Sequence, residues 1–184
     1  INPDRKYADV MERALYNGIL SGMSWEGNRF FYVNPLAVSP EVCSSRKDHE
    51  HVKPTRQGWF TCACCPPNLA RFVASLGTYA YAEEQGTAYV HLYLGSTAEL
   101  DLGGQKVTLT QGTNYPWDPT VRLKVDPAAP GRFTVALRVP AWCRAPRLTV
   151  NGADVAMAAI VERGYARLER DWQAGDVVEL TLPM

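Results

Sequence analysis

Apolar positions recur at two different periods along the chain, and the change falls near residue 86. Before it, apolar side chains follow the i, i+3, i+4, i+7 spacing of amphipathic helices, and after it they alternate with polar ones as in strands. We therefore expect a mixed fold, with a helical part over residues 1–83 and an all-β domain over residues 86–184.

The first helix is expected to start with Asn2 as its cap and Pro3 in its first turn, and to end at Gly22. Its apolar stripe consists of Tyr7, Val10, Met11, Ala14, Leu15 and Leu20. On the polar side, Asp9 and Arg13 are four residues apart and can pair. Because such a stripe needs a partner surface, a part with so few helices predicts self-association or disorder.

A second helix is predicted where Pro66 and Pro67 suit the turn into a helix and its first turn. Its apolar face consists of Leu69, Phe72, Val73, Leu76 and Ala80. Between the two helices, residues 28–37 are predicted to form a strand that Pro35 ends, and residues 39–58 a long polar loop.

Eight short segments with alternating polarity are predicted as strands in the second part. The pair Asn151-Gly152 between two of them is a strong hairpin signal. Short strands at this spacing indicate an antiparallel β-sandwich, jelly-roll-like in type. The predicted strands cover residues 87–94, 97–102, 106–111, 121–125, 133–139, 148–150, 165–169 and 177–182.

Composition narrows the class of protein. Apolar residues make up 46% of the 184 positions, and the 19 basic and 19 acidic residues cancel to a net charge of zero. A neutral chain without a basic run has no electrostatic reason to bind nucleic acid or an anionic membrane, and no apolar run is long enough to span a bilayer. Since the chain opens at a helix and closes right after a strand, we expect both ends to be cut from a larger protein.

The candidate chemistry lies in the cysteines, of which there are five, with Cys62, Cys64 and Cys65 packed into four positions. This is no disulfide framework, and thiols just before a helix are stabilised as thiolates by its dipole. Zinc ligation, a reactive thiol and an inert buried thiol all remain open on this basis. His49 and His51 are possible further ligands if that segment is extended, and otherwise belong to a solvated loop.

Recognition of a family rests on the run Trp59 to Arg71, whose core is Cys-Cys-Pro-Pro-Asn. It resembles the signature of the beta-L-arabinofuranosidases, glycoside hydrolase family 127. Residues 7–18, 31–36 and 114–117 resemble further stretches of the same family in the same order. The resemblance spans essentially the whole chain and implies the end of an (α/α)6 catalytic barrel followed by a β-sandwich.

The resemblance also implies the roles of two cysteines. Cys64 would be a nucleophile and a zinc ligand in a retaining reaction, and Cys65 would be a second zinc ligand, whereas Cys62 receives no role. The family's other zinc ligands and its acid/base glutamate would precede this chain. We therefore expect zinc as cofactor with an incomplete site, an arabinofuranoside glycan as substrate, the missing barrel half as partner, and no activity of the chain alone.

Two other functions are weighed against the enzyme fragment. The β-sandwich would be a carbohydrate-binding or interdomain-docking module with bystander cysteines, or the thiols would serve a metal- or redox-responsive interaction domain. Cys64→Ala in the full-length protein separates the first of these from the enzyme. Reduced thiols favour a cytoplasmic location, which the sequence does not otherwise fix.

Overall fold

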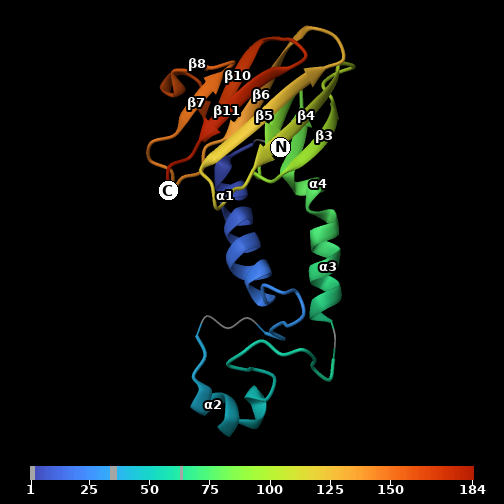
Figure 1. Ribbon diagram of the computed structural model, residues 1–184, viewed down its shortest axis with the longest axis vertical. Coiled ribbons are helices and arrows are strands. Elements are labelled where there is room, and N and C mark those ends of the chain that lie inside the picture. Colours follow the sequence, from blue (N-terminus) through green and yellow to red (C-terminus); the bar gives the residue numbers. More distant parts are fainter. Residues whose placement is uncertain (1–2, 34–36, 63) are drawn as a thin grey trace. The chain divides into compact units, whose positions relative to one another are not determined.

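The computed structural model describes residues 3–33, 37–62 and 64–184, which fold as two compact units (Figure 1). The β unit comprises Gly77–Met184 together with Ile1–Asp9, and the helical unit comprises Val10–Leu76. The first helix, α1 (Arg5–Arg13), therefore contributes residues to both units. No helix in the described ranges is long and apolar enough to cross a membrane.

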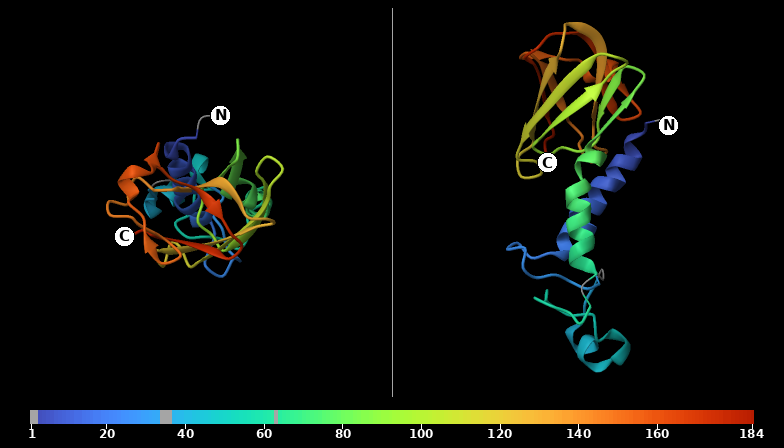
Figure 2. Two further views of the ribbon diagram at one scale, coloured as in Figure 1. Left: turned by 90° about the horizontal axis from the view of Figure 1, so that it is seen from above. Right: turned by 90° about the vertical axis from the view of Figure 1, so that its right-hand side faces the viewer.

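The β unit is a sandwich of two sheets, as the alternating pattern predicts (Figures 1 and 2). A short helix, α4 (Gly77–Ala80), leads into it. The five-stranded sheet has the order β1 (Tyr81–Glu84), β2 (Thr87–Val90), β6 (Gly131–Arg138), β10 (Tyr165–Trp172) and β9 (Val161–Glu162). The six-stranded sheet has the order β3 (Ser96–Asp101), β4 (Lys106–Thr113), β5 (Thr120–Pro127), β11 (Asp176–Thr181), β7 (Arg147–Val150) and β8 (Ala153–Asp154).

All eight predicted strands are present, with ends shifted by a few residues. The pairing differs from the antiparallel expectation at one place, where β2 lies parallel to β6 with Tyr89 opposite Ala136. The strands β1, β8 and β9 were not predicted, because each is short and only β1 contains an aromatic residue.

The core lies between the two sheets. Val121, Leu123 and Val125 alternate along β5 and are fully buried, as are Val135 and Leu137 of β6. Removing each such side chain from water contributes about 1.5–3 kcal/mol to folding. The long alternating strands therefore fix which face of each sheet points inward.

Three hairpin turns have the same backbone conformation. In each, two consecutive residues have positive φ, as in a type I′ turn, and the second is glycine. The predicted turn at Asn151-Gly152 is confirmed. The other two are Gln85-Gly86, between β1 and β2, and Arg163-Gly164, between β9 and β10.

The outer face of the five-stranded sheet is unusually polar. Tyr89, Ala136 and Tyr165 form a buried cluster of their own, separate from the sandwich core, since their strand neighbours point inward. Arg138 is fully buried at this face, and its Nε donates to the carbonyl of His91 at 2.6 Å. Arg5 and Asp9 lie against this face and are held there by polar contacts, the first to the Val139 carbonyl and the second to Arg138.

The helical run begins and ends close to where the apolar stripe predicts. The carboxylate of Asp4 accepts a hydrogen bond from the Lys6 amide at 2.9 Å and so caps α1, whereas the predicted cap, Asn2, lies outside the described residues. Beyond α1 the run continues as a π-helix (Ala14–Ile19) and a 3₁₀ turn (Leu20–Gly22). It therefore stops at Gly22, as predicted.

The segment between the helices departs from its prediction. Residues 28–37 were expected to be a strand, but Phe30 makes only isolated bridges, to Met23 and to Gln57, and residues 34–36 lie outside the described ranges. The predicted loop over 39–58 contains the helix α2 (Pro40–Ser45) and a 3₁₀ turn (Lys47–His49). The predicted second helix is present as α3 (Cys65–Ser75).

Candidate metal and thiol site

The cysteine cluster lies at the N-terminal end of α3, where the chain enters the helix. Cys64 occupies the cap position and Cys65 is the first helical residue, followed by two prolines that need no hydrogen-bond acceptor. The carbonyl of Cys64 accepts from the amide and from the side-chain nitrogen of Asn68, at 3.3 and 3.2 Å. Asn68 therefore stabilises the backbone of the first helical turn, from which both cysteine side chains extend.

The two sulfurs have the spacing of a shared metal. Cys64 Sγ and Cys65 Sγ are 3.8 Å apart. Two thiolates bound to one tetrahedral zinc at about 2.3 Å each are separated by about 3.8 Å. The donors present thus fit zinc in type and in spacing, although they amount to two of the usual four ligands.

Tyr32 contacts both cysteines and was not singled out as a site residue from the sequence. Its carbonyl accepts from Cys65 Sγ at 3.2 Å, and its hydroxyl hydrogen-bonds with Cys64. Its ring packs against Phe60 and His51, with centroids 5.5 and 5.8 Å away. The available signal was its place in residues 31–36, one of the stretches that resembles the family.

The thiols differ in acidity. Hydrogen bonding from Cys65, supported by Tyr32 and Cys62, lowers the pKa of Cys64 below that of an ordinary thiol. Burial, followed by the hydrogen bond to Cys64, raises the pKa of Cys65, and the hydrogen bond to Cys64 raises the pKa of Tyr32. The surroundings therefore favour the thiolate at Cys64, whose side chain is exposed to an incoming molecule.

The two histidines do not share a face as an extended segment would require. His49 is the last residue of the 3₁₀ turn Lys47–His49, so the segment is not extended, and His49 lies 3.9 Å from the carboxylate of Asp48, which Arg46 binds. Only His51 approaches the cluster, through the ring of Tyr32. Across the described ranges, no group of three or more His, Cys, Asp and Glu side chains is arranged to hold a metal ion.

The remaining cysteines lie elsewhere. Cys43 lies in α2 and is partly exposed. Cys143 is buried in the sandwich core, as expected of a small apolar residue, with its sulfur 3.8 Å from the carbonyl of Pro183. All five thiols are free.

Comparison with known proteins connects both units to one family. Residues 87–184 match the family profile described as the beta-L-arabinofuranosidase GH127 middle domain, and residues 1–78 match the corresponding catalytic domain. The chain is 38% identical over 190 aligned positions to a non-reducing end beta-L-arabinofuranosidase of Bifidobacterium longum subsp. longum, of which it covers 28%.

Solved structures give the same result. A GH127 beta-L-arabinofuranosidase from Geobacillus stearothermophilus T6 is 55% identical and superposes with a TM-score of 0.90 over 98% of this chain and 28% of its own. A second GH127 beta-arabinofuranosidase is 40% identical, with a TM-score of 0.83 over 98% of this chain and 29% of its own. The chain thus spans less than a third of the length of these relatives.

Proposed function

Because the chain belongs to the GH127 beta-L-arabinofuranosidase family, we propose that it is part of a retaining glycoside hydrolase that releases terminal beta-L-arabinofuranosyl units. The observation that carries this proposal is the 3.8 Å pair of sulfurs at the start of α3, with the lowered pKa of Cys64. A thiolate that is both exposed and stabilised is suited to attack an anomeric carbon.

In this proposal, Cys64 and Cys65 would hold a zinc ion, and zinc supplies a Lewis acid that keeps thiols deprotonated at neutral pH. The thiolate of Cys64 attacks the anomeric carbon, forming a carbon–sulfur bond as the bond to the aglycone oxygen breaks. Water then displaces the sulfur from the same carbon. Two displacements in sequence return the original configuration.

Tyr32 would position the nucleophile. Its hydroxyl donates to the sulfur of Cys64, and its carbonyl accepts from the thiol of Cys65, so one residue orients both side chains. The ring contacts with Phe60 and His51 limit how far Tyr32 can turn. The leaving oxygen still requires a proton, and the donor and the remaining metal ligands would come from the part of the enzyme that precedes this chain.

The test is a comparison of variants in the full-length enzyme, assayed with an aryl beta-L-arabinofuranoside. Cys64→Ala is expected to lower kcat by at least about 10⁴-fold, because no other group can form the covalent bond. Cys43→Ala, which removes a thiol far along the chain from the cluster, serves as the control and should change little. A glycosylated Cys64 should be detected by mass spectrometry of rapidly quenched enzyme, and full activity of Cys64→Ala would refute the assignment.

A further inference from the structure

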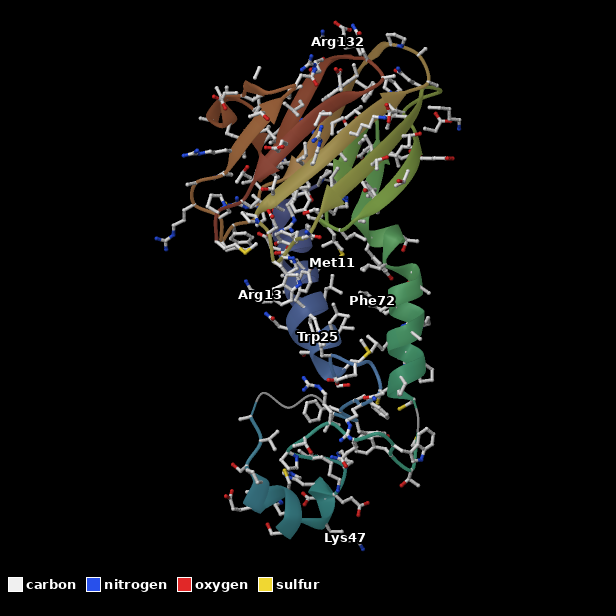
Figure 3. The ribbon with its side chains drawn as sticks, in the orientation of Figure 1. Met11, Arg13, Trp25, Lys47, Phe72 and Arg132 are labelled. Carbon is white, nitrogen blue, oxygen red and sulfur yellow. The ribbon has the colours of Figure 1, made fainter. Side chains whose placement is uncertain are left out.

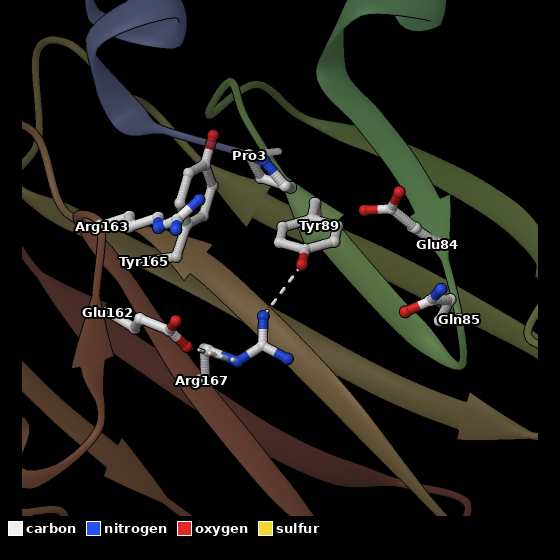
Figure 4. A pocket seen from close by; sticks show the side chains of 8 residues that line it. All are labelled: Pro3, Glu84, Gln85, Tyr89, Glu162, Arg163, Tyr165 and Arg167. Atoms are coloured by element: carbon white, nitrogen blue, oxygen red, sulfur yellow. Dashed lines mark hydrogen bonds and ion pairs between the residues drawn. The ribbon is translucent and has the colours of Figure 1, made fainter. Parts of the chain in front are cut away.

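The β unit has a pocket that no part of the proposed reaction uses. It has a volume of about 490 Å³ and lies on the outer face of the five-stranded sheet, between the β1–β2 and β9–β10 hairpins (Figure 4). That volume falls within the range of about 300–1,000 Å³ typical of small-molecule sites. The cysteine cluster belongs to the other unit, so the two features are separate sites.

Strand register determines the floor of the pocket. Tyr89, Ala136 and Arg167 are neighbours across β2, β6 and β10. Because the central residue is alanine, the two larger side chains reach each other above it, and Arg167 Nη1 donates to the Tyr89 hydroxyl at 2.9 Å. Arg167 Nε also lies 3.6 Å from a carboxylate oxygen of Glu162. The floor is thus preorganised by contacts within the sheet.

The polar groups of the pocket are mixed in kind. Glu84 and Glu162 oppose Arg163 and Arg167 in charge, and Gln85 adds an amide. Since two acidic and two basic side chains balance, the lining does not favour a charged ligand. Within the described part of the chain, Arg167 is the one hydrogen-bond partner found for the Tyr89 hydroxyl, which accepts and so keeps its own proton available to donate.

We propose that this pocket binds an uncharged saccharide. Hydroxyl groups both donate and accept, so a sugar can satisfy carboxylate, guanidinium, amide and phenol groups together, whereas an ion would leave half of them opposed. The site would hold glycan at the sandwich independently of the thiols, which extends the proposed function to a second contact with the same class of substrate.

The proposal is tested by titrating the 184-residue chain with methyl beta-L-arabinofuranoside, using isothermal calorimetry and ligand-observed NMR. Working in the Cys64→Ala/Cys65→Ala background keeps the result independent of the proposed hydrolase site. Saturable binding is expected there. It should weaken at least about tenfold in Glu162→Gln, which removes a charged acceptor from an exposed side chain and so should not disturb folding.

A second variant guards against a misfolding artefact. Gln85→Gly removes the amide at a position with φ of 48°, where glycine is unstrained, and is also expected to weaken binding. Arg132→Ala is the matched control, because Arg132 lies on the same sheet, paired with Glu169 and outside the pocket (Figure 3). No saturable binding, or equal affinity in the control and both pocket variants, would overturn the proposal.

Discussion

The guanidinium of Arg138 lies 2.6 Å from the carboxylate of Asp9, although the two residues are 129 positions apart in the sequence. The other oxygen of Asp9 accepts from the Ala141 amide at 3.2 Å. The arginine side chain is fully buried, and Tyr93 donates to its carbonyl. The pair therefore ties the start of α1 to the outer face of the sheet. The helical spacing offered Arg13, four residues on, as a possible partner of Asp9, and the ion pair that the structure shows is with the distant Arg138.

Breaking this ion pair should destabilise the β unit strongly. Asp9→Asn leaves a buried guanidinium without its counter-charge, at an expected cost of about 3–5 kcal/mol in the free energy of unfolding. Urea unfolding followed by circular dichroism measures it. Arg132→Ala breaks an exposed pair with Glu169 and should cost less than about 1 kcal/mol. Equal losses in the free energy of unfolding for the two changes would show that the buried pair contributes no more to stability than the exposed one.

Stability should fall below neutral pH because of His91. Burial, and then the charge of Arg138, lower the pKa of His91 below its ordinary value near 6.5, and its Nδ1 lies 2.7 Å from the hydroxyl of Tyr165. The folded state therefore favours the neutral ring. The unfolded chain takes up a proton at His91 near pH 6.5, whereas the folded chain does so only at lower pH. The free energy of unfolding is therefore greatest above about pH 6.5 and decreases as the pH falls toward the folded pKa of His91. Urea unfolding between pH 7.5 and 5.5, as rough limits, should show this slope, and His91→Gln should flatten it.

At alkaline pH the free energy of unfolding should also decrease, because of Tyr165. Burial raises the pKa of Tyr165 to about 12. Because the unfolded chain ionises near pH 10, stability should be lost as the pH rises from about 10 toward 12. Ultraviolet absorbance of tyrosinate should lose one late-titrating group in Tyr165→Phe.

Alanine substitutions at two glycines can distinguish the cost of backbone strain from the cost of a steric clash. Gly164 and Gly175 have φ of 80° and 90°, but a Cβ at Gly164 would clash with the side chain of Arg5, whereas nothing lies within 4 Å of a Cβ at Gly175. Gly175→Ala should therefore cost about 1–2 kcal/mol from strain alone. Gly164→Ala should cost about 1–3 kcal/mol more, because Arg5 must move. Thermal or urea unfolding of the two variants gives the difference directly.

Metal content distinguishes a shared zinc site from a lone reactive thiol. In the full-length enzyme we expect about one zinc per chain after purification without chelator. Cys65→Ala should lower zinc content and activity together, because it removes one of the two sulfurs that stand 3.8 Å apart. Elemental analysis measures this, with Cys43→Ala as control. Unchanged zinc in Cys65→Ala would exclude that residue as a ligand.

Sequence reasoning succeeded where one local signal determined the structure. Alternation in strands such as β5 follows directly from burial on one face, and Asn151-Gly152 determines a turn by its own backbone preferences. The cysteine cluster was singled out because its spacing is rare, and its role as a zinc-thiolate site stays a prediction. Residue type alone gave no such signal at Arg163-Gly164, where a charged residue adopts positive φ.

The failures share a physical cause, which is dependence on residues distant in sequence. Asp9 pairs with Arg138, which is distant in sequence, because an ion pair with a buried arginine is stronger in a less polar medium. Tyr32 contacts the cysteines through its carbonyl and its hydroxyl, and it lies 33 residues before Cys65, so no local pattern at the cluster could reveal those contacts. The strand expected over residues 28–37 has no adjacent strand in the described ranges, and Phe30 makes only isolated bridges there.

The parallel pairing of β2 with β6 has a consequence for how the domain folds. Thr87 meets Thr134 across it, and β3, β4 and β5 all lie between them in the chain. The entropy of closing so long a loop must be lost before the pair gains any contact, whereas hairpins such as β4–β5 close locally. Antiparallel strands of one sheet should thus form early and shorten the effective loop, so that β2 and β6 join late. The parallel pairing of β2 with β6 therefore determines the order in which the strands assemble as well as the final topology.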